Sequence, residues 1–84
     1  MTQTQIEEAT ELDARGLLCP MPIVKTAKAM RELEPGQVLK LIATDRGSVA
    51  DVPAWASSTG NELLESHEED GTFVFFLRKG GEVS

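Results

Sequence analysis

The spacing of apolar and polar residues changes several times along the chain, and each change marks a new element. Apolar residues that alternate with polar ones are typical of strands, whereas a spacing of three or four residues indicates an amphipathic helix. Glycine and proline separate these stretches. The pattern predicts six elements: a strand over 10–15, a helix over 20–33, a strand over 37–44, a helix over 49–59, and strands over 61–68 and 72–78.

Both predicted helices carry signals at their ends. An apolar stripe is expected along the first helix: Ile23, Val24, Ala27, Met30 and Leu33. Pro35-Gly36 ends this helix. The second helix is expected to have Ser48 or Asp51 as its N-cap, Pro53 near its first turn and Gly60 at its end.

The order of these elements predicts an α/β (α+β) fold. We expect a two-layer β-α-β-α-β-β sandwich with both helices on one face of a four-stranded mixed sheet. Phe73, Phe75 and Leu77 share one face of the last strand and are candidates for its core. The predicted organisation is a flexible N-terminus over 1–9, a single domain over 10–79 and a polar tail over 80–84.

The only cysteine, Cys19, lies in the run Leu17-Leu18-Cys19-Pro20-Met21-Pro22. Proline fits the first turn of a helix, where backbone N–H groups have no intrahelical partner. We therefore expect Cys19 at the N-cap and Pro20 at the first helical position, with the N–H groups of Met21 and Ile23 directed at the sulfur. A helix N-terminus lowers a thiol pKa from about 8.5 to roughly 3.5–7.5, which predicts an exposed thiolate. The alternative is a small buried hydrophobic residue.

Charged residues are expected near this cysteine. Parallel strands joined by a helix end at the same edge of a sheet, where ligands bind in open α/β folds. The residues predicted to cluster there are Arg15, Cys19, Asp45, Arg46 and Asp51. The two arginines are candidates to support an anionic sulfur, and the two aspartates to oppose it or accept a proton. Alternatively, Arg15 forms an exposed ion pair, and Asp45 and Asp51 are turn and cap residues.

Composition excludes several classes of function. Fourteen acidic and eight basic residues give a net charge of −6, which disfavours direct binding to nucleic acid and suits partner proteins with basic patches. One cysteine and one histidine provide neither an internal disulfide nor a metal site, and we expect no cofactor. No apolar run spans a membrane and residues 1–10 do not resemble a signal peptide, so a cytoplasmic monomer is expected.

The run from Leu12 to Pro22 resembles the signature of the TusA/SirA family of small sulfur-carrier proteins, whose mark is Cys-Pro-x-Pro at the start of the first helix. The resemblance extends over about residues 10–80. Its further matches are Pro35-Gly36, Thr44-Asp45, Asp51-Val52-Pro53 and Gly60.

This resemblance implies that Cys19 carries a persulfide. A donor protein, either a cysteine desulfurase or a rhodanese-like protein, supplies the sulfur, and an acceptor protein receives it. The relay serves tRNA thiolation, molybdenum cofactor assembly or sulfur oxidation. The resemblance assigns supporting roles around the sulfur or at the docking surface to residues matching Asp13, Arg15, Asp45 and Asp51.

The turn itself is expected to present the sulfur through Pro20, Met21, Pro22 and Ile23, so that replacing Pro22 alters transfer more than stability. His67 lies in a distant strand and supplies no base, which indicates a carrier rather than a self-sufficient catalyst. An alternative function is a thiol-redox or regulatory module that acts through mixed disulfides of Cys19.

Overall fold

A computed structural model describes residues 9–18 and 20–80. Cys19 and the residues numbered 1–8 and 81–84 lie outside the described residues, and expectations about them stay predictions. The described residues form the elements β1 (Thr10–Ala14), α2 (Met21–Arg31), β2 (Val38–Ala43), α3 (Ser48–Thr59), β3 (Glu62–Glu69) and β4 (Thr72–Arg78). The order and type of the predicted elements are confirmed.

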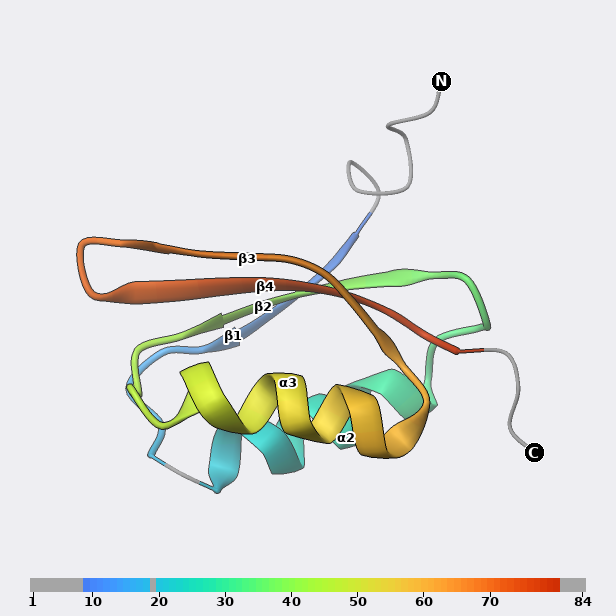
Figure 1. Cartoon of the computed structure of the whole chain (residues 1–84), viewed down its shortest axis with the longest axis horizontal. Helices are drawn as coiled ribbons and strands as arrows, with labels where there is room; N and C mark the ends of the chain where they lie inside the picture. Colours follow the sequence, from blue (N-terminus) through green and yellow to red (C-terminus); the bar gives the residue numbers. More distant parts are fainter. Residues whose placement is uncertain (1–8, 19, 81–84) are drawn as a thin grey trace.

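The strands form one mixed sheet in the order β1-β2-β4-β3. β1 is parallel to β2, and the two strands end side by side because Ala14 pairs with Ala43. β4 is antiparallel to both β2 and β3. Figure 1 shows both helices on the same face of this sheet. The predicted two-layer α+β sandwich is therefore confirmed. No helix among the described residues is long and apolar enough to cross a membrane.

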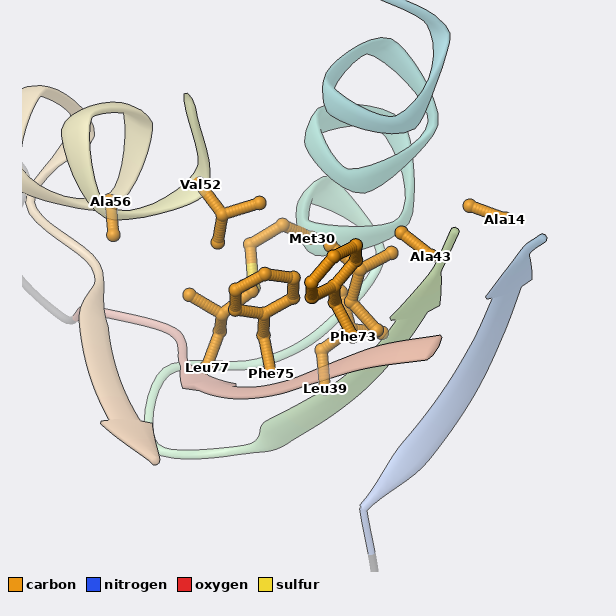
Figure 2. Packing of buried hydrophobic residues seen from close by; sticks show 10 residues of the cluster. Ala14, Met30, Leu39, Ala43, Val52, Ala56, Phe73, Phe75 and Leu77 are labelled. Carbon is orange, nitrogen blue, oxygen red and sulfur yellow. The ribbon is translucent and has the colours of Figure 1, made fainter. Parts of the chain in front are cut away.

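The main core lies between the sheet and the two helices. Figure 2 shows Phe73, Phe75 and Leu77 of β4 directed toward Val52 and Ala56 of α3. These three residues of β4 share one face because side chains alternate along a strand. The intervening residues Val74 and Phe76 of β4 pack on the opposite face in a smaller cluster with Val38 of β2. β4 therefore contributes buried side chains to both faces of the sheet.

The buried face of α2 differs from the predicted stripe. Pro22, Thr26 and Met30 are the buried residues of this helix, whereas Val24, placed on the stripe from the sequence, is 50% exposed. Thr26 is tolerated in the interior because its hydroxyl donates a hydrogen bond to the carbonyl of Pro22 at 2.7 Å. The hydroxyl is satisfied inside the helix, so a residue that the sequence pattern counts as polar belongs to the core.

The N-cap of α3 is Gly47, not Ser48 or Asp51 as predicted, and no side chain caps the helix. The helical hydrogen bonds begin earlier than expected, because the N–H groups of Ala50 and Asp51 both donate to the carbonyl of Gly47, at 3.2 and 3.0 Å. Pro53 consequently lies inside the helix rather than near its first turn.

Leu41 provides a test of this core. It is fully buried in the central strand β2, so Leu41→Ala should lower the free energy of unfolding by about 2–5 kcal/mol. Leu18→Ala is the matched control, because Leu18 is 70% exposed and its loss should change stability by no more than about 0.5 kcal/mol. Urea unfolding followed by circular dichroism measures both, and equal effects would show that the assigned burial is wrong.

Candidate functional site

Leu18 and Pro20, the described neighbours of Cys19 in the sequence, lie directly before α2. The N–H of Met21 donates to the carbonyl of Leu18 at 2.8 Å, and the N–H of Ile23 donates to the carbonyl of Pro20 at 3.1 Å. Both groups were expected to point at the sulfur, and the structure instead engages them with backbone oxygens. The N-cap is Pro20, one residue later than predicted. Cys19 itself lies outside the described residues.

The two prolines of this turn have different environments. Pro22 is among the fully buried side chains, whereas Pro20 is exposed. Leu18, on the other side of the cysteine, is also exposed. Position 19 therefore lies between two exposed neighbours, and Pro22 anchors the following turn of helix in the interior.

A hydrogen bond ties the loop before the cysteine to the end of β2. The N–H of Gly16 donates to the Thr44 hydroxyl at 2.9 Å. Gly16 has a φ of 82°, a backbone conformation that glycine adopts without strain. The sequence analysis did not predict this contact. The available signal was the parallel pairing of β1 and β2, which places the residues just after each strand at the same edge.

Asp13 and Arg15 form an exposed ion pair at the end of β1. The carboxylate of Asp13 accepts hydrogen bonds from the Arg15 Nε at 2.9 Å, the Arg15 Nη2 at 3.0 Å and the Arg15 backbone N–H at 3.0 Å. The guanidinium hydrogen bonds, followed by the backbone bond, lower the pKa of Asp13 from 3.8 to about 2. The carboxylate in turn raises the pKa of Arg15 above its ordinary value. The ion-pair alternative for Arg15 is thus what the structure shows.

The carboxylates of Asp45 and Asp51 both lie close to Gly47, at the N-terminus of α3. A Cβ on Gly47 would lie 3.1 Å from an Asp45 carboxylate oxygen and 3.9 Å from one of Asp51. Both carboxylates therefore surround the N-cap, where the helix dipole favours negative charge. This position agrees with turn and cap surroundings for both residues.

The edge of the sheet where β1 and β2 end thus carries two sets of charged residues, which come from different parts of the chain. One is the Asp13–Arg15 pair after β1, and the other is the Asp45–Asp51 pair at the start of α3. Within 9–18 and 20–80, no three His, Asp or Glu side chains are grouped closely enough to hold a metal ion. Among the described residues, this edge is therefore marked by charged side chains and not by a metal site.

The fold is a small α+β sandwich, and the sequence has its single cysteine directly before the first helix. The family model described as sulfurtransferase TusA matches residues 10–79, and the chain belongs to this family.

Individual proteins agree with this assignment. The chain is 55% identical over 69 residues to the sulfur carrier protein TusA of Allochromatium vinosum, covering 82% of this chain and 91% of that protein. It is 59% identical over 73 residues to YrkF of Bacillus subtilis, covering 87% of this chain but only 40% of that longer protein. The crystal structure of a SirA-like protein from Desulfitobacterium hafniense matches with a TM-score of 0.69 and 28% identity, covering 84% of this chain and 97% of that one.

The buried position of Pro22 changes what its replacement should do. Pro22→Ala removes buried apolar groups and should lower the free energy of unfolding by about 1–2 kcal/mol more than Pro20→Ala. The comparison is matched because both variants gain similar freedom in the unfolded chain. Chemical unfolding measures the difference. Equal stabilities of the two variants would restore the sequence-based expectation that replacing Pro22 alters sulfur transfer more than stability.

The Asp13–Arg15 pair predicts a pH dependence. Because the pKa of Asp13 is lower in the folded chain, the pair's contribution is complete above about pH 4 and is lost as the pH falls toward about 2. Arg15→Gln should raise the pKa of Asp13 toward 3.8. The pKa should stay below 3.8, because the backbone N–H of residue 15 still donates to the carboxylate. Carboxyl ¹³C shifts measured against pH test this, and Arg46→Gln is the control that should leave Asp13 unchanged. An Asp13 that titrates near 3.8 in the unaltered chain contradicts the prediction.

Proposed function

We propose that Cys19 carries sulfane sulfur as a persulfide and passes it from a donor protein to an acceptor protein in the cytoplasm. The observation that carries the proposal is the position of the only cysteine, between exposed Leu18 and Pro20 at the entrance to α2, in a chain of the TusA family. The proposal requires a thiol that another protein can reach, and the exposure of both described neighbours of Cys19 supports this requirement.

The transfer needs no cofactor and no net oxidation. The Cys19 thiolate attacks the outer sulfur of the donor's persulfide, a new S–S bond forms, and the donor leaves as a thiolate. In the second step an acceptor thiolate attacks the outer sulfur on Cys19, and Cys19 returns to a thiolate. The chain has no second cysteine to attack its own persulfide, so both steps are intermolecular.

Exposed apolar residues beside the cysteine support docking of a partner. Leu18, Met21 and Val24 are 70%, 42% and 50% exposed, and Met21 and Val24 lie on one side of α2 because residues three apart are neighbours on a helix. Burial of such side chains favours association. We propose that Asp45, Asp51 and the Asp13–Arg15 pair form a charged border around this apolar surface.

The proposed donor is a cysteine desulfurase or a rhodanese-like protein, and the proposed acceptor belongs to tRNA thiolation, molybdenum cofactor assembly or sulfur oxidation. The charged border contains more aspartates than arginines, and the chain has a net charge of −6. Both features fit donors and acceptors whose docking surfaces are basic.

Intact-protein mass tests the proposal directly. After incubation with a cysteine desulfurase and cysteine, or with a rhodanese and thiosulfate, the chain should gain about 32 Da, the mass of one sulfur atom, and lose it on reduction. Cys19→Ser should gain nothing while keeping the circular dichroism spectrum of the parent chain.

Two results would contradict persulfide transfer. One is the absence of any mass gain with either donor, together with slow alkylation of Cys19 by iodoacetamide, which returns the cysteine to a buried structural role. The other is a gain equal to a whole thiol compound in place of one sulfur atom, which favours the mixed-disulfide alternative.

A further inference from the structure

A cavity of about 270 Å³ lies between the C-terminal parts of α2 and α3. It is at the end of the molecule opposite the first residues of α2. Thr59, which lines it, precedes β3, and β3 begins beside the last residue of β4, whereas the chain reaches Cys19 from the other end of the sheet. In Figure 1 the two helices end at the side of the sheet where β4 also ends.

The cavity has an apolar wall that includes the only tryptophan of the chain. Trp55 of α3 contributes a half-buried aromatic side chain, and Ala27 and the buried Met30 contribute from α2. An aromatic ring beside aliphatic groups suits the flat apolar part of a small ligand. The cavity is open to solvent, and its volume lies just below the range of about 300–1,000 Å³ of drug-sized sites, which suits a compact molecule.

The charged groups of the cavity are all positive among the residues that the structure describes. Arg31 and Lys79 line it, and none of its described lining residues is acidic, although the chain as a whole carries a net charge of −6. Arginine pairs with a carboxylate through two parallel hydrogen bonds, which makes it well suited to bind this group.

Lys79 is held in place before any ligand arrives. Its ammonium donates to the carbonyl of Leu33 at 2.7 Å, and its backbone N–H and carbonyl bond to Gln37 and Gly36, both at 2.9 Å. An ammonium has three hydrogens, so one bond to Leu33 leaves two for a ligand.

The wall beyond Lys79 is also fixed. The N–H of Gly80 donates to the Asn61 side chain at 2.9 Å, and a Cβ on Gly80 would lie 2.0 Å from the Gly60 carbonyl oxygen. The backbone is therefore packed too closely there for any other residue, and the cavity is preformed.

We propose that this cavity binds a small organic anion with a flat apolar body, of the aromatic carboxylate class. The aromatic part packs against Trp55, and the carboxylate meets Arg31 and Lys79. The site is separate from Cys19, and binding there requires no sulfur on the cysteine.

Phenylacetate is the probe. Because Trp55 is the only tryptophan and the chain has no tyrosine, its fluorescence reports on this cavity alone. Phenylacetate should change the fluorescence and the indole N–H resonance of Trp55 saturably, with a dissociation constant of about 1 mM or tighter. Benzyl alcohol, which lacks the charge, and acetate, which lacks the ring, should each bind at least about tenfold more weakly.

Variants separate this site from general electrostatic attraction. Arg31→Gln should weaken phenylacetate binding at least about tenfold, whereas Lys28→Gln, on the same helix but outside the cavity, should leave it unchanged. Arg31 is exposed, so its variant should keep the fold, which circular dichroism verifies. The proposal is overturned if phenylacetate causes no saturable change at Trp55, if benzyl alcohol binds equally well, or if both variants lose the same affinity.

Discussion

The burial of Pro22 is the constraint on which the cysteine end of the molecule depends. Successive residues of a helix are about 100° apart around its axis, so residues two apart lie on nearly opposite sides. Pro22 is buried, and Pro20 is correspondingly exposed. Pro22 also supplies the carbonyl that satisfies the buried hydroxyl of Thr26. The two prolines therefore have different roles, since one anchors α2 in the core and the other stiffens the exposed approach to it.

Charges at this end of the molecule are largely balanced against one another. The guanidinium of Arg15 is held by Asp13, and the carboxylates of Asp45 and Asp51 lie at the positive end of α3. The N–H groups of Met21 and Ile23 already donate to backbone carbonyls. The Arg15 guanidinium and these two N–H groups thus already have partners within the chain. In the proposed transfer Cys19 is the leaving thiolate and the outer sulfur is what passes on, so a lower pKa of the Cys19 thiol would favour release to the acceptor.

The sequence pattern predicted the fold well because alternation, helical spacing and glycine or proline breaks are local signals. It failed where a tertiary or backbone contact decided the outcome. Val24 was placed on the buried stripe because it is apolar, yet it is exposed. Thr26 was left off the stripe because it is polar, yet it is buried, since its hydroxyl donates to the Pro22 carbonyl. The contact between Gly16 and Thr44 joins residues 28 positions apart, and only the register of β1 against β2 reveals it.

For the site, the pattern identified the charged residues at the correct edge but not their partners. β1 ends at Ala14, and the turn that follows lets both the backbone N–H and the guanidinium of Arg15 reach the Asp13 carboxylate. From the sequence alone, an exposed ion pair and a role at the sulfur were equally open for Arg15. The N-cap of α3 could not be assigned from residue types, because Gly47 caps it without a side chain while better capping residues follow directly.

The two ends of α2 allow the proposed sulfur transfer and the proposed anion binding to take place together. The exposed apolar residues lie at the start of this helix and the cavity lies at its end. A helix of 11 residues is about 16 Å long, so a compact anion beside Arg31 leaves the surface around Met21 open to a partner protein. The buried residues of α2, Pro22, Thr26 and Met30, lie in one row along the helix, and Met30 also lines the cavity. The same buried row therefore packs both ends of α2 against the core.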